Sequence, residues 1–204
     1  MTKAILKSEQ QETYIKLYDF IFKHEDFYEM RLTSKYLFCV MMDYMSLSMK
    51  VSNDSSITIP HEILADKLQV TGRSITTMKN ELKSHDLIEE TFMGIGKVTK
   101  ITINQEKVKQ YRNRSGILTF MLLPKSVYEN KDISISSKVL YAFLLNRFEK
   151  TKTDSISLSN EEMSKMLNVS LSKARKTKKE LVSDGKIIEQ RRGHAQANTI
   201  QLND

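Results

Sequence analysis

Apolar positions between Ile63 and Leu82 follow the spacing of two short helices joined by a tight turn. The large apolar residues that follow Ile63 are Leu64, Leu68, Val70, Ile75, Met78 and Leu82. Ala65 is small where the two helices would touch, and Thr71 can cap the second helix by accepting a backbone N–H. The spacing predicts a helix-turn-helix, although any helical hairpin needs a similar pattern.

The same pattern recurs 99 residues later, over 163–181, with the cap, the turn and the closing Glu-Leu pair in register. The matching positions are Gln69 and Asn168, Thr71 and Ser170, and Glu81-Leu82 and Glu180-Leu181. The match extends upstream to Tyr28-Glu29 and Tyr128-Glu129, which indicates two whole domains and not only two repeated motifs.

Each copy also contains the other elements of one fold. A buried helix is predicted over 33–45 and 136–148, followed by a short alternating strand at 57–59 and 156–158. After each helix-turn-helix come two alternating runs separated by glycines, at 87–92 and 98–103 and at 186–190 and 198–202, which is typical of a β-hairpin. The predicted fold is mainly α with small β-hairpins (α+β), as two tandem winged helix-turn-helix domains.

Domain boundaries follow from the same pattern. The N-terminal domain is expected over 1–104, and the polar stretch 105–116 is interpreted as a linker to the C-terminal domain, 117–204. Residues 8–23 are expected to form an extra N-terminal amphipathic helix in part, with a short strand at the aromatic-rich end. Its apolar face needs a partner, either the domain behind it or a second subunit, so a homodimer through this segment stays open.

Composition narrows the class of protein. The chain has 204 residues, 40% of them hydrophobic and 28% charged, and its net charge of +7 favours polyanionic partners. The single cysteine, Cys39, lies in an apolar run and is expected to be a buried, reduced thiol. Because the N-terminus lacks the apolar core of a signal peptide and no run reaches membrane-spanning length, a cytoplasmic location without membrane contact is expected.

The second helix of each helix-turn-helix supplies candidate DNA contacts, because its outer face carries side chains that reach phosphates and base edges. In the first copy these are Arg73, Ser74, Thr76, Thr77, Lys79, Asn80 and Lys83. In the second copy they are Ser170, Ser172, Lys173, Arg175, Lys176 and Lys179, with Lys178 in the same basic run. So many like charges cannot be buried together, so most should project outward, either to DNA or simply to solvent.

The two recognition helices are expected to differ in role. Arg73 is the expected base reader of the first recognition helix, so that copy should add sequence selectivity, whereas the second should supply more non-specific affinity. The hairpin loops add candidate contacts at Lys97, Lys100, Arg191, Arg192 and His194. Met93 and Ile95 at the first loop make either a protein contact or fold back onto the domain.

Enzymatic chemistry has little support. The four histidines are scattered without metal-ligand spacing, and Gly94-Ile95-Gly96 lacks the lysine and helix of a phosphate-binding loop. We therefore expect no catalytic residue, no cofactor and no metal.

Three segments resemble the winged-helix domain of plasmid and phage replication initiators, with the RepA_N initiators of Gram-positive plasmids as the nearest type. They are residues 122–128, 135–147 and 180–188. The paired domains are also similar to initiators that bind repeated origin sites. The first domain matches less well, and Gln69 stands at a turn position that Gly or Asn adopts more easily.

The resemblance and the residues together predict a sequence-specific double-stranded DNA-binding protein that initiates or controls replication of a plasmid or other mobile element. Its partner would be origin repeats, with a replisome protein as a further option. The alternatives are a transcriptional regulator, such as a repressor bound to an operator, and a winged-helix protein-interaction scaffold.

Overall fold

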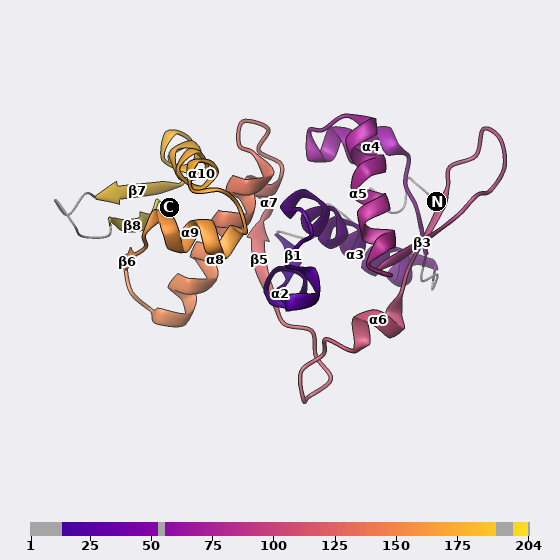
Figure 1. Cartoon of the computed structure of the whole chain (residues 1–204), viewed down its shortest axis with the longest axis horizontal. Coiled ribbons are helices and arrows are strands. Elements are labelled where there is room, and N and C mark those ends of the chain that lie inside the picture. Colours follow the sequence, from indigo (N-terminus) through magenta and orange to yellow (C-terminus); the bar gives the residue numbers. More distant parts are fainter. Residues whose placement is uncertain (1–13, 53–55, 191–197, 204) are drawn as a thin grey trace. The chain divides into compact units, whose positions relative to one another are not determined.

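The computed structural model describes residues 14–52, 56–190 and 198–203, and it divides the chain into unit 1, residues 1–120, and unit 2, residues 121–204 (Figure 1). Each unit has its own buried core.

Unit 1 places a helix-turn-helix against a small antiparallel sheet. Its elements are β1 (Tyr14–Tyr18), α2 (Asp19–Lys23), the 3₁₀ turn η2 (Glu25–Phe27), α3 (Leu32–Ser52), β2 (Ser56–Thr58), α4 (His61–Leu68), α5 (Gly72–Ser84), β3 (Ile88–Thr91), β4 (Lys100–Ile103) and α6 (Gln105–Lys109). The strand order is β2-β4-β3, with Ile57 opposite Ile101 and Ile88 opposite Ile103. Helix, short strand, two helices and hairpin in this order make a winged helix.

Unit 2 follows the element order of unit 1 from β1 to β4, without a counterpart of η2 among the described residues. Its elements are β5 (Phe120–Pro124), which begins at the last residue of unit 1, α7 (Lys125–Tyr128), α8 (Ile135–Thr151), β6 (Ile156–Ser157), α9 (Asn160–Leu167), α10 (Leu171–Ser183), β7 (Ile187–Gln190) and β8 (Thr199–Leu202). The sheet order β6-β8-β7 repeats that of unit 1, with Ile156 opposite Ile200 and Ile187 opposite Leu202. The predicted fold class, mainly α with small β-hairpins, is confirmed.

The long helices α3 and α8 form the centres of the two cores. Leu37, Phe38 and Met41 of α3 and Val139 and Leu140 of α8 are fully buried. Burying each such side chain stabilises the fold by about 1.5–3 kcal/mol. Both helices extend beyond the predicted ranges.

Cys39 lies within this core as expected and is a free, fully buried cysteine. Burial raises the pKa of its thiol to about 12, so the reactive thiolate is suppressed.

The predicted turns and caps of the two helix-turn-helix motifs are confirmed. Gln69 and Asn168 end the first helices in the left-handed conformation, with φ of 56° and 51°. The Thr71 hydroxyl accepts the Ser74 backbone N–H at 3.2 Å, and Ser170 does the same for Lys173 at 3.3 Å. These local interactions set the entry of α5 and α10.

The N-terminal segment differs from the prediction in the order of its elements. Residues 8–13 lie outside the described residues, 14–18 form a strand, and the aromatic-rich end is the helix α2. The helix is supported by an ion pair between Asp19 and Lys23, 2.7 Å long and four residues apart. It places the Phe20 ring against Phe38, with centroids 5.9 Å apart.

The predicted linker 105–116 also differs from the structure in its first half, which is folded onto unit 1. The Asn104 side chain caps α6 by accepting the Lys107 N–H at 3.1 Å, and Val108 is fully buried. The Tyr111 ring stacks on Phe20, with centroids 4.8 Å apart. The Tyr111 hydroxyl also donates to Asp26 at 2.6 Å, so contacts with residues far away in the sequence hold this polar stretch on unit 1.

Candidate nucleic-acid interface

The outer face of α5 carries five of the predicted contact residues. Arg73, Thr76, Thr77, Asn80 and Lys83 are all exposed and recur at helical spacing, and Ser74 is half-buried beside them. Thr76 and Thr77 donate their hydroxyls to the carbonyls four residues earlier, at 3.3 and 3.1 Å. Their methyl groups and oxygen lone pairs are therefore what remains for a ligand.

Lys79, predicted to contact DNA, is instead a buried structural residue. It is only 1% exposed, and its Nζ lies 2.7 Å from His61 Nε2 and 3.0 Å from Glu90 Oε1. The prediction was wrong because a carboxylate on the following strand and a histidine on the preceding helix accept hydrogen bonds from this ammonium. These bonds offset the free-energy cost of removing its charge from water.

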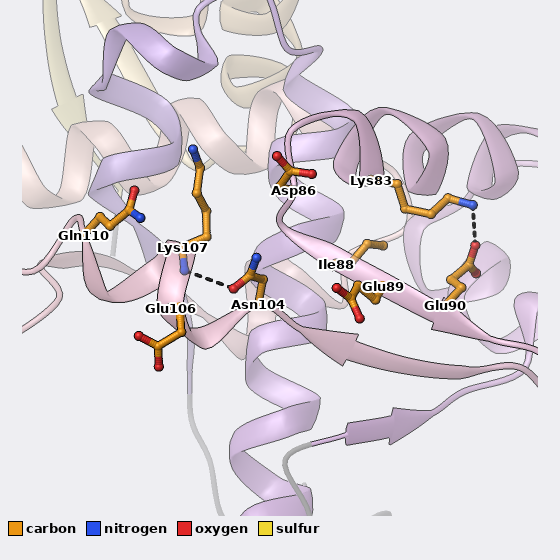
Figure 2. A pocket seen from close by; sticks show the side chains of 9 residues that line it. All are labelled: Lys83, Asp86, Ile88, Glu89, Glu90, Asn104, Glu106, Lys107 and Gln110. Carbon is orange, nitrogen blue, oxygen red and sulfur yellow. Dashed lines mark hydrogen bonds and ion pairs between the residues drawn. The ribbon is translucent and has the colours of Figure 1, made fainter.

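Glu90 connects the recognition helix to the hairpin. Lys83 Nζ donates to its other carboxylate oxygen at 2.8 Å, as Figure 2 shows. Burial opposes ionisation of Glu90, but the hydrogen bonds from Lys83 and Lys79 outweigh it and lower the pKa of this carboxyl. Lys83 is exposed, so it still reaches solvent from the outer face while it holds β3.

The outer face of α10 is more basic at its centre. Ser172, Arg175, Lys176 and Lys179 are exposed, and the three cations form no ion pair or hydrogen bond with any residue that the structure describes. Ser170 is used as the helix cap. Lys173 is half-buried, and its charge acts on Glu180, about two turns further along the same helix.

Lys178 does not project outward with its neighbours. It is 6% exposed and its Nζ is paired with Glu189 on β7. The expectation that the basic run faces solvent therefore holds for Arg175, Lys176 and Lys179 and fails for Lys178, because helical geometry turns this position toward the hairpin.

The two recognition helices can be compared position by position, because α5 and α10 are 99 residues apart. The outward positions pair as Arg73 with Ser172, Thr76 with Arg175, Thr77 with Lys176, Asn80 with Lys179, and Lys83 with Val182. The first helix thus has cations at the two ends of its face and polar groups between, while the second has its cations in the middle.

Carboxylates that sequence reasoning missed hold both helices in place. Glu90 and Glu189 bind the buried lysines, while Glu81 and Glu180 bind the start of the long helix. Glu180 accepts the Ser134 and Ser137 hydroxyls, each at 2.6 Å. In both copies these glutamates stand at the same spacing from the buried lysine, Lys79 or Lys178. This repeated spacing is the sequence signal that could have revealed them.

Burial opposes the ionisation of Glu180 as well. The hydrogen bonds from Ser134 and Ser137 outweigh that effect and lower the pKa of its carboxyl. The acid therefore stays charged where it fastens the recognition helix to α8.

The predicted hairpin contacts are only partly described. Lys97 is exposed at the first hairpin loop, and Lys100 is half-buried at the start of β4. Arg191, Arg192 and His194 lie outside the described residues, so their placement stays a prediction.

A groove of about 700 Å³ lies beside the end of α5, between β3 and α6, and Figure 2 shows its lining. Asp86, Glu89, Glu90 and Glu106 contribute four carboxylates against two lysines. Carboxylates repel a polyanion, so this groove is not suited to a DNA backbone.

No group of three or more potential metal ligands occurs in the described part of the chain, and none of its helices is long and apolar enough to span a bilayer.

No family model and no curated protein matches the chain. Among solved structures, a Rep–DNA complex is 26% identical over 50% of this chain and 81% of that chain, with a TM-score of 0.38. The Pi initiator protein in complex with iteron DNA is 12% identical over 95% and 98% of the two chains, with a TM-score of 0.49. The N-terminal domain of a DNA-binding protein is 23% identical over 57% and 85%, with a TM-score of 0.33.

Since all three TM-scores lie below 0.5, the winged-helix assignment rests on the strand order and helix geometry of this chain itself.

Proposed function

We propose that the chain is a sequence-specific double-stranded DNA-binding protein that initiates or controls replication of a plasmid or other mobile element, and that it acts by binding and not by catalysis. The observation that carries the proposal is the sorting of charge on the recognition helices. Lys79 and Lys178 are neutralised internally, whereas the cations of the α10 outer face have no partner among the described residues.

Unpaired cations on one helix face repel one another until a polyanion neutralises them. Arg175, Lys176 and Lys179 lie within two turns, and each phosphate contact contributes about 0.9 to the salt dependence of binding. This supports phosphate contacts as the main role of α10.

Side chains on α5 are suited to reading bases. Arg73 can bond guanine and Asn80 adenine, each good pair giving about 1–3 kcal/mol of discrimination, and the methyl groups of Thr76 and Thr77 can contact thymine. We infer that unit 1 contributes more of the selectivity and unit 2 more of the affinity.

The replication role is supported by the resemblance of residues 122–128, 135–147 and 180–188 to replication initiators. Footprinting on the DNA that flanks its own gene tests it. We expect protection of several direct repeats, as at an origin. A single protected palindrome over a promoter would indicate a repressor instead, and weak binding that salt does not affect would indicate a protein-interaction scaffold.

The division between the units is tested by Arg73→Ala and Arg175→Ala in duplex-binding assays. We expect Arg73→Ala to weaken binding to the preferred sequence by about 1–3 kcal/mol more than binding to an unrelated sequence. Arg175→Ala should weaken binding to both sequences alike. It should also lower the salt slope, the slope of log affinity against log salt concentration, by about 0.9. An equal loss for all sequences with Arg73→Ala would contradict the division.

A further inference from the structure

The hairpin loop of unit 1, residues 92–99, exposes a cluster of large apolar side chains. Phe92 is 73% exposed, Met93 46%, Ile95 99% and Val98 37%. Figure 1 shows the loop extending well beyond β3. Single exposed apolar residues are common, but four within seven positions form a patch of the kind that marks a binding surface.

The structure decides between the two readings of this loop left open by the sequence. Had Met93 and Ile95 folded back onto the domain, they would be buried against it. Ile95 instead makes almost no contact with the rest of the protein. The loop is therefore available to a partner.

The loop is fixed relative to the recognition helix. Its base is the β3–β4 ladder, in which Thr91 lies opposite Lys100, and β3 is held to α5 by Glu90. At the tip, the Lys97 N–H bonds the Gly94 carbonyl at 3.1 Å, and Gly94 and Gly96 adopt the positive φ that this turn requires. A ligand bound to the face of α5 would thus meet this loop at a defined place.

The charge of the loop favours a polyanion. Residues 91–100 contain Lys97 and Lys100 and no carboxylate, and Lys97 is exposed beside Ile95. Apolar residues such as Phe, Ile and Met flanked by cations are the groups with which minor-groove proteins enter between base steps, unstack them and bend the duplex.

We propose that the loop 92–99 inserts Ile95, supported by Phe92 and Met93, as an apolar wedge into the minor groove of the bound duplex and bends it. This inference rests on the proposed function, since it needs DNA on α5. It adds a deformation of the duplex that base contacts by α5 do not require.

The test uses a duplex of about 40 base pairs selected from a randomised pool by the full wild-type chain and labelled at both ends for energy transfer. We expect the wild type to bend this duplex by an angle in the range of about 20–90°. Ile95→Ser should weaken binding on the order of tenfold and reduce the bend, with an unchanged salt slope because no charge is lost.

Two further variants separate the wedge from other effects. Lys97→Ala should lower the salt slope by about 0.9. Ile117→Ser changes another exposed loop isoleucine of unit 1 and should alter neither bend nor affinity.

A straight bound duplex, or an equal bend with Ile95→Ser, would overturn the wedge while leaving the proposed function intact. If the wild type selects no duplex at all, both proposals fail. Sedimentation of the free protein provides the remaining check. Self-association that Ile95→Ser abolishes, with no change in the bend, would assign the loop to a second copy of the chain and overturn the wedge.

Discussion

Neighbouring lysines on the same helix can have opposite roles. Lys178 is buried and paired with Glu189, while Lys179 is exposed at the centre of the basic face. Removing one partner of a buried pair leaves an uncompensated charge, whereas removing an exposed charge costs the fold little.

We therefore expect Lys178→Gln to lower the free energy of unfolding of unit 2 by about 2–3 kcal/mol, somewhat less than for a fully buried pair because Glu189 is partly exposed. Hydrogen exchange of the α10 and β7 amides measures this loss. The matched variant Lys179→Gln should change stability by less than about 0.5 kcal/mol but lower the salt slope of DNA binding by about 0.9. Equal effects of the two variants on both measurements would contradict these roles.

At the scale of elements, each recognition helix is held from two sides. Glu81 and Glu180 connect α5 and α10 to the start of α3 and α8, and Glu90 and Glu189 connect them to the hairpin. In unit 1 the first helix of the motif joins this network through His61, whereas the matching position in unit 2 is Asn160.

This difference makes unit 1 sensitive to pH. Burial, and then the nearby Lys79 ammonium, lower the pKa of His61 from its ordinary value of 6.5, against the opposing effect of Glu90 and Glu62. The unfolded chain therefore binds a proton at His61 more readily than the folded unit does. The free energy of unfolding is unaffected by His61 above pH 6.5 and falls as the pH drops below that value.

Hydrogen exchange of the α4 and α5 amides at about pH 7.5 and about pH 5.5, corrected for intrinsic exchange rates, measures this loss of stability. His61→Asn, which introduces the residue of unit 2, should remove this part of the pH dependence. The lowered pKa of Glu90 contributes stability that is present above pH 4.5 and is lost only as the pH falls below that value, so Glu90 should not contribute in this window. An identical loss of stability in the wild type and in His61→Asn would contradict the role of His61.

At the scale of the whole molecule, the proposed function gives one chain two unlike DNA-binding units. Covalent linkage would let the second unit bind at a high effective concentration once the first is bound, which would raise the affinity by about 10²–10⁴ when both engage. Neither unit then needs a high affinity for DNA on its own.

The combined variant Arg175→Ala, Lys176→Ala and Lys179→Ala should therefore lower affinity for a selected duplex by about 100-fold or more and reduce the salt slope by about 2.7. The ranking of sequences should persist, because α5 is unchanged. Removing three exposed cations elsewhere, Arg112, Arg114 and Lys150, is the control for overall charge and should have a much smaller effect. An unchanged salt slope in the α10 variant would show that this face does not contact phosphates.

Local patterns in the sequence were sufficient for most of the fold. Apolar periodicity, the caps Thr71 and Ser170 and the glycine-separated strand pairs predicted the helix-turn-helix motifs and hairpins that the structure contains. The repeat at 99 residues strengthened each of these predictions, because two independent copies show the same order. Such features depend on neighbours a few residues apart, so they can be read along the chain.

Only the tertiary structure decided which individual side chains are buried and which are exposed. It buried Lys79 and Lys178 against Glu90 and Glu189, folded α6 and Tyr111 onto unit 1, and left Ile95 exposed. Each outcome depends on which distant residue lies opposite. A charge enters the interior only where a partner at the right place offsets its desolvation, and that partner is supplied by the packing of elements, which composition and spacing do not contain.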